Sequence, residues 1–145
     1  MLSWLDEKTE KDVKLGDSID DLGIEGEDEA LNTVTRRKFE QNGWEVQLYF
    51  ADDRLVHRIV IEKSSTDPGE LSDFQSQADA IMDRLKGHLG RSKKVSLGGG
   101  ATMWKWRKDV NAGVMLQTPV AAKGGEDALN KVEIMAKIQT LDAPA

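Results

Sequence analysis

The feature that most constrains the fold of this chain is the stretch from Asn42 to Glu62, with the sequence NGWEVQLYFADDRLVHRIVIE. Asn42-Gly43 predicts a two-residue type I′ turn, because both residue types accept positive φ angles. Asp52-Asp53 predicts a second turn farther along the chain. The two turns define a three-stranded antiparallel meander, whose first strand is Thr33 to Glu40, a polar strand expected near a sheet edge.

Alternation of apolar and polar residues predicts which side chains of this meander share a face. The first turn places Phe39 opposite Val46. The second turn places Phe50 opposite Leu55, Leu48 opposite His57, Val46 opposite Ile59, and Trp44 opposite Ile61. Because successive side chains of a strand point to opposite faces, these residues all lie on one apolar face. The meander is therefore expected to bury one face and to expose the other.

A long helix is predicted directly after this meander. The connector Lys63 to Glu70 contains Pro68 and Gly69, which break regular structure, and Ser72 with Gln75 has the spacing of a capping box. Apolar residues then recur at steps of three and four: Phe74, Ala78, Ile81, Met82, Leu85 and Leu89. This spacing is typical of a helix that packs along one face, so we interpret the stripe as core.

The other segments predict a short helix, a loop and further strands. Leu15 to Ile24 has Asp17 or Ser18 as a helix cap and ends near Gly23, which favours a short helix. The acidic stretch Glu25 to Glu29 and the basic, glycine-rich stretch Arg91 to Gly100 are both expected to be loops. Strands are expected over residues 102–107, 114–120 and 129–139, with a helix as the alternative for the last segment.

Together these elements predict an α+β fold, an antiparallel sheet of five to six strands with one long helix packed on one face. A helix-plus-meander unit occurring twice is an alternative, although the two halves show no self-similarity. The expected organisation is an acidic N-terminal arm with a short helix over residues 1–31, a single α+β domain over 32–139 and a disordered tail over 140–145. A length of 145 residues suits one such domain.

Charge is distributed unevenly along the chain, whose net charge is −6. Residues 1–31 contain 11 acidic residues against 3 lysines, and the rest of the chain contains 15 acidic residues against 17 basic ones. The segment from Arg84 to Lys108 contains eight Lys and Arg residues and no acidic residue. The chain therefore has an acidic arm and a basic middle, a pattern that chiefly governs partner encounter and specificity.

Several chemistries are not supported by any pattern in the sequence. There is no cysteine, which excludes disulfides and thiolate zinc sites and fits a reducing compartment. His57 and His88 lack metal-ligand spacing, and no serine lies in a Gly-x-Ser-x-Gly elbow. The leading residues lack a basic region followed by an apolar run, and no stretch approaches ~20 apolar residues. We therefore expect no enzyme, no metal, no cofactor and no membrane contact, and a cytoplasmic protein.

The glycine run Gly98 to Gly100 is the remaining candidate for phosphate binding. No Lys-Ser or Lys-Thr follows it, and the next segment predicts a strand and not a helix, so the P-loop and dinucleotide-binding contexts are both missing. A flexible loop is the favoured interpretation.

The function favoured by these observations is a small acidic protein-binding module of the adaptor, inhibitor, immunity or chaperone type. Its partner is expected to be another protein, bound through six acidic residues of the arm: Asp20, Asp21, Glu25, Glu27, Asp28 and Glu29. An unpaired edge strand is a further means of forming a homodimer or capturing an extended peptide.

The alternative is a single-stranded nucleic-acid-binding protein that uses the basic segment 84–108, with the acidic arm as an internal competitor. Its candidate anion-binding residues are Arg91, Lys93, Lys94, Lys105 and Arg107. Lysines and arginines bind phosphates, and bases stack on indole rings. Trp104 and Trp106 alternate with Lys105 and Arg107, however, so both indoles are expected in the core, where no base can stack on them.

Overall fold

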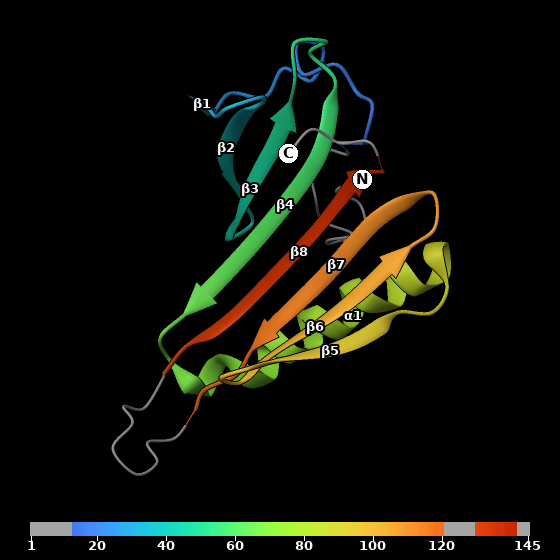
Figure 1. Ribbon diagram of the computed structural model, residues 1–145. Helices are drawn as coiled ribbons and strands as arrows, with labels where there is room; N and C mark the ends of the chain where they lie inside the picture. The colour runs from blue at the N-terminus through green and yellow to red at the C-terminus, as the bar shows by residue number, and fades with distance from the viewer. Residues whose placement is uncertain (1–12, 121–129, 142–145) are drawn as a thin grey trace.

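The structure is a computed structural model, and it describes residues 13–120 and 130–141. Its elements in chain order are β1 (Glu27–Ala30), β2 (Thr35–Gln41), β3 (Trp44–Phe50), β4 (Val56–Ser65), a 3-10 turn (Pro68–Glu70), α1 (Leu71–Leu89), β5 (Lys93–Gly98), β6 (Ala101–Arg107), β7 (Val110–Gln117) and β8 (Val132–Thr140). The strands form one eight-stranded antiparallel sheet in the order β1-β2-β3-β4-β8-β7-β6-β5 (Figure 1). Two four-stranded meanders therefore join where β4 pairs with β8.

The sheet corrects the predicted fold class. It has eight strands and not five to six, and the described residues contain a single α-helix of 19 residues, so the protein is mostly sheet. The helix-plus-meander repeat is also wrong, because among the described elements no helix precedes the first meander. The two strands that the sequence did not predict are β1 and β5, which lie at the two edges of the sheet. Edge strands are solvated and often charged, so neither has the apolar alternation of a buried strand.

The glycine run between β5 and β6 forms a tight turn and not a flexible loop. Gly98, Gly99 and Gly100 all have positive φ angles, of 76°, 59° and 82°. A Cβ atom on Gly100 would lie 2.7 Å from the carbonyl oxygen of Thr118, so no other residue fits there without a shift. The glycines therefore form the turn of the β5–β6 hairpin. The residues before them are a strand and not part of a loop, because this turn lets them pair with β6.

The predicted helix over Leu15 to Ile24 is also wrong. The segment contains turns, with positive φ angles at Gly16 (90°) and Gly23 (61°). Its backbone pairs with the chain just before β4, where the Ile19 N–H donates to the carbonyl oxygen of Arg54 at 2.9 Å. Ile19 is buried in the core, so this part of the acidic arm packs against the sheet.

The meander around Asn42-Gly43 agrees with the sequence except in one register. Asn42 and Gly43 have φ angles of 53° and 82°, which confirms the turn, and Phe39 lies opposite Val46 as predicted. The connection between β3 and β4 is longer than predicted, so Val46 lies opposite Ile61 and not Ile59. A register shift of two residues keeps each side chain on its original face. The predicted apolar face is therefore buried, except next to the turn. There a register shift after Tyr49 places Phe50 opposite Val56 and not Leu55, so Val56 is buried and Leu55 is 37% exposed.

The helix α1 covers one face of the second meander (Figure 1). It buries Phe74, Ala78, Ile81 and Leu85 of the predicted stripe. They join the alternate residues of β7 and β8 in one core: Ala112, Val114, Leu116, Val132, Ile134, Ala136 and Ile138. Burial of each large apolar side chain contributes about 1.5–3 kcal/mol, so this packing holds the helix in place. The predicted capping box is not formed, because Glu70 is the N-cap residue and makes no side-chain capping bond.

The last strand, β8, confirms the strand interpretation of residues 129–139 over the helix alternative. Thr140 ends this strand, whereas residues 142–145 of the predicted disordered tail lie outside the described residues. Residues 1–12 of the predicted arm also lie outside them. Within the described ranges, the structure contains no helix with the length and apolar character needed to cross a membrane.

Candidate anion-binding face

Strand alternation carries three lysines of the second meander onto the face that α1 does not cover. Lys93 lies opposite Lys105, Lys105 lies opposite Gly113, and Gly113 lies opposite Lys137. Cross-strand partners have their side chains on the same face of a sheet. The alternate positions of β6, β7 and β8 are the buried ones that pack with α1. Lys93, Lys105 and Lys137 therefore form a line across the open face, which we term the lysine row.

Gly113 occupies the one position in this line that has no side chain. A Cβ atom built there would lie 3.4 Å from the Met103 sulfur and 3.6 Å from Cε of Lys137, so these two side chains lie over the glycine. Neighbouring strands are about 4.8 Å apart, which separates the backbones of Lys105 and Lys137 by about 10 Å. Two flexible lysine side chains at this spacing can both reach one anionic group.

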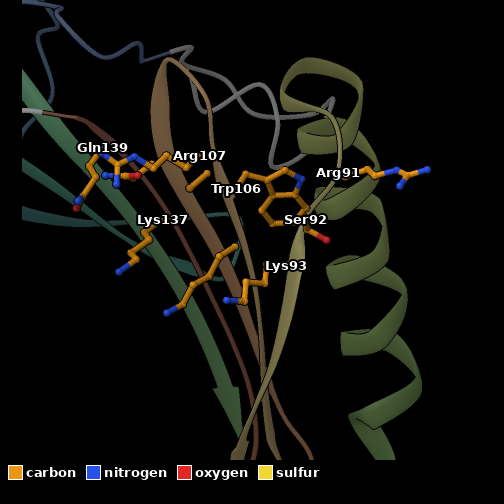
Figure 2. Close-up of a pocket in the computed structure, with 10 residues that line it drawn as sticks. Arg91, Ser92, Lys93, Trp106, Arg107, Lys137 and Gln139 are labelled. Carbon is orange, nitrogen blue, oxygen red and sulfur yellow. The ribbon is translucent and has the colours of Figure 1, made fainter.

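A hollow of about 530 Å³ lies at this row. Its lining includes two amides, Asn111 and Gln139, and five cationic residues: Arg91, Lys93, Lys105, Arg107 and Lys137. No carboxylate is among the described residues that line it. In Figure 2, Lys93 and Lys137 extend to the same side of the sheet, Arg107 reaches toward Gln139, and Arg91 points away from the other cations. The hollow is therefore a cationic site with amide hydrogen-bonding groups at one end.

The cations of this hollow have no acidic partner within residues 13–120 and 130–141. Neither the lysine row nor Arg107 forms an ion pair there, whereas at the other end of the sheet Lys38 pairs with Glu45 at 3.8 Å and Arg37 with Asp28 at 2.7 Å. Like charges directly opposite each other on adjacent strands are destabilising. The opposed pair Lys93 and Lys105 therefore lowers the stability of the sheet. Residues that lower stability without a compensating contact are typical of functional surfaces.

Three methionines lie beside the lysine row on the same face. Met103 is the cross-strand partner of Met115, and Met115 is the partner of Met135. Val95 of the edge strand extends this line, because it lies opposite Met103. All four side chains are partly exposed. Methionine is flexible and polarizable, so this methionine row provides an adaptable apolar surface next to the cations.

The structure brings together some of the predicted anion-binding residues and separates others. Lys93, Lys105 and Arg107 share the hollow, and Arg91 lines it but points away. Lys94 lies on the opposite face, where its Nζ is 5.8 Å from the centre of the Trp104 ring. Lys137 was not predicted, because it reaches this face only through the pairing of β7 with β8.

Both tryptophans that were weighed for base stacking lie on the face opposite the lysine row. Trp106 is 4% exposed, and its Nε1–H donates to the carbonyl oxygen of Gly90 at 3.1 Å. Trp104 is partly buried and packs against the core cluster. The predicted core position of both indoles is therefore confirmed. Trp106 also contributes to the lining of the hollow, but its burial leaves no ring face on which a base could stack.

Three of the six acidic residues proposed as a protein-binding surface are paired with arginines. Arg54 donates to Asp20 at 2.6 Å and Arg37 donates to Asp28 at 2.7 Å, and these hydrogen bonds lower the pKa values of both carboxyl groups. Glu29 forms a further pair with Arg36.

The remaining acidic residues of this proposed surface, Asp21, Glu25 and Glu27, are exposed. Glu27 lies opposite Lys38 on the neighbouring strand. The arm is therefore less available to a partner than its sequence suggests.

A pair of carboxyl groups on the open face was not predicted. Glu45 and Glu62 lie opposite each other on β3 and β4, and the Gln47 amide donates to both, at 3.0 and 2.7 Å. A hydrogen bond to Glu45, together with burial, raises the pKa of Glu62 to about 7. The pKa of Glu45 is lowered by the same hydrogen bond. The two groups therefore share one proton below neutral pH.

Within residues 13–120 and 130–141, no group of three or more His, Cys, Asp and Glu side chains is arranged so that it could hold a metal ion. His57, which the sequence placed on the apolar face of the meander, has its Nε2 2.9 Å from a carboxylate oxygen of Asp53. This contact stabilises the turn before β4, because the same carboxylate also accepts the Leu55 N–H at 3.0 Å.

Comparison with protein-family models, with curated proteins and with solved structures gave no match to this chain.

Proposed function

We propose that this protein is a non-catalytic binding module that takes an acidic segment of another protein on the open face of the second meander. The observation that supports this proposal is the lysine row, in which Lys93 and Lys105 oppose each other and Lys137 follows across Gly113. Unpaired cations that repel one another gain stability when an anion binds among them. The ligand is therefore expected to be anionic.

The methionine row favours an acidic protein segment over a nucleic acid as this anion. Met103, Met115 and Met135 provide apolar contact for leucine or valine side chains between the acidic ones. Sequence-tolerant binding of single strands instead requires exposed aromatic rings beside the cations. Trp106 lines the hollow but is only 4% exposed, and Trp104 packs against the core on the other face. The net charge of −6 also opposes general attraction to nucleic acid.

The experiment measures fluorescence anisotropy of labelled polyglutamate and of labelled oligothymidine at low and high salt. The site variant carries Lys93→Gln, Lys105→Gln and Lys137→Gln. The matched control carries Lys14→Gln, Lys86→Gln and Lys108→Gln, three exposed lysines that do not line the hollow. Both triple variants have the same net charge, so a difference between them reports the position of the lysines and not the total charge.

Polyglutamate is expected to bind the native protein, and the site variant is expected to lose about tenfold in affinity, since each surface ionic contact contributes about 0.2–1 kcal/mol. The control triple variant is expected to retain most of the affinity. An equal loss of affinity for polyglutamate in the two variants would contradict the proposal. Tighter binding of oligothymidine than of polyglutamate, with a loss of affinity only in the site variant, would also contradict it. The second result would assign the lysine row to nucleic acid.

A further inference from the structure

We infer that the acidic partner binds as an additional antiparallel strand on the outer edge of β5, with two neighbouring acidic residues beside Lys93 and Lys94 and apolar residues beside Val95 and Leu97. This inference rests on the proposed function, since it specifies how a partner reaches the lysine row. The occupant is thus an extended peptide of defined chemistry, in which apolar residues at alternate positions precede a pair of carboxylates.

The edge strand β5 has the backbone groups that such a peptide requires. It contains six residues and, among the described elements, pairs only with β6, which leaves its outer side open. Five of its residues are exposed and Val95 is partly exposed. An exposed edge of this length presents unpaired N–H and C=O groups to a further strand.

The other edge of the sheet is a poorer acceptor. β1 contains only four residues, and two of them, Asp28 and Glu29, already pair with arginines of β2. Its charge is also of the wrong sign for an acidic partner. The lysine row and the free edge that suits an acidic strand therefore lie at the same end of the sheet.

The side chains of β5 specify the order of residues in the partner. Lys93 points to the open face, where it lines the hollow, and Lys94 points to the helix face. Two consecutive acidic residues beside them would each meet one lysine, because neighbouring side chains of the added strand also point to opposite faces.

Farther along β5 the surface becomes apolar. Val95 lies next to Met103, and Leu97 is 54% exposed at the bulge before Gly98. Because an antiparallel partner runs in the opposite direction to β5, its apolar residues come first and its acidic pair comes last. A peptide containing Val-Thr-Val-Glu-Glu has this order.

The test uses this capped, labelled peptide, a scrambled peptide of the same composition, and two N-methylated forms that carry methyl groups on alternate residues. In a paired edge strand, alternate N–H groups point toward the neighbouring strand and toward solvent. Only one of the two methylated forms should therefore lose binding. The protein is used as the full chain, with Lys93→Gln/Lys94→Gln as the site variant and Lys86→Gln/Lys108→Gln as the control.

Strand addition predicts a loss of at least about tenfold for one methylated form, since each backbone hydrogen bond contributes about 1 kcal/mol, and little change for the other. It also predicts weaker binding of the scrambled peptide and of the site variant, with the control unchanged. Equal tolerance, or equal loss, of the two methylated forms would overturn strand addition.

The two proposals fail in different ways. If the peptide binds, loses affinity in the Lys93→Gln/Lys105→Gln/Lys137→Gln variant and tolerates both methylation patterns, the acidic partner lies across the face and the proposed function stands. If the peptide does not bind whereas polyglutamate does, strand addition is wrong and the lysine row still binds acidic protein. If neither binds, both proposals are overturned.

Discussion

Lys93 and Lys105 lie directly opposite each other on the neighbouring strands β5 and β6, and neither forms an ion pair with any residue in the described part of the chain. A directly opposed pair of like charges costs stability in a sheet. The protein therefore carries an unfavourable interaction in the hollow that five cationic residues line.

Neutralising one member of this pair should stabilise the protein. Lys105→Gln is expected to raise the free energy of unfolding by about 0.5 kcal/mol at low salt, because it removes repulsion from Lys93. The gain should shrink in high salt, which screens exposed charges. Urea denaturation at two salt concentrations measures both effects, with the exposed helical Lys86→Gln as the control. A loss of stability in Lys105→Gln that is independent of salt would contradict this prediction.

The carboxyl pair on the open face should make stability depend on pH near neutrality. The folded-state pKa of Glu62 is raised to about 7 from 4.5, so the folded protein holds this proton more tightly than the unfolded chain. The resulting stabilisation is complete below pH 4.5 and is lost as the pH rises to about 7. Glu62→Gln keeps a neutral side chain at all pH values.

This variant should be more stable than the native protein at pH 8, by about 1 kcal/mol after allowance for solvent screening, and equally stable at pH 4. Thermal unfolding across this pH range measures the difference. Asp79→Asn, an exposed residue of α1 far from this pair in the sheet, is the control and should show no such pH dependence. A constant difference between Glu62→Gln and the native protein at every pH would refute the shared proton.

The pair between Asp28 and Arg37 should stabilise the edge strand β1 with the opposite pH dependence. The hydrogen bond from Arg37 lowers the pKa of Asp28, so its contribution is present above the unfolded pKa of 3.8 and is lost as the pH falls. Asp28→Asn is expected to cost about 0.5 kcal/mol at pH 7 and nothing in strong acid. Hydrogen exchange of the β1 amides would detect the local loosening, with exposed Glu27→Gln as the comparison.

The helix face of the second meander should be sensitive to loss of volume. Ile81 of α1 is completely buried, so Ile81→Ala is expected to cost about 3 kcal/mol through lost burial and the cavity that remains. Asp83→Ala, an exposed change on the same helix, should alter stability by less than about 0.5 kcal/mol. Similar losses in the two variants by chemical denaturation would show that α1 does not pack as described.

The parts of this fold that the sequence predicts are those in which local chemistry decides the structure. The Asn42-Gly43 turn and the stripe from Phe74 to Leu85 depend on neighbouring residues, and both are found as expected. The strands β1 and β5 were missed because their residues are charged and exposed, and only their partner strands make them extended. Neither strand has an alternation that distinguishes it from a loop.

The candidate site depends on registers that no local pattern determines. The predicted two-residue turn before β4 would place Glu62 opposite Gly43, and the longer connection brings it opposite Glu45 instead. Likewise, the basic segment indicated Lys93 and Lys105, but Lys137 joins them only because β8 pairs with β7. Such contacts follow from the lengths of connections and from long-range pairing, which a single sequence does not specify.

The pairing of β4 with β8 also determines the order in which the chain can fold. All other neighbouring strands of the sheet follow each other in sequence, whereas β4 and β8 are separated by α1 and most of the second meander. Contacts between distant parts of a chain form slowly, because the entropy of closing the loop is lost before the contacts are gained. The two meanders are therefore expected to form early, and the pairing of β4 with β8 is expected to form last. Ile61 and Ala136, which lie opposite each other in that pairing, are then expected to make their contact in the rate-limiting step of folding.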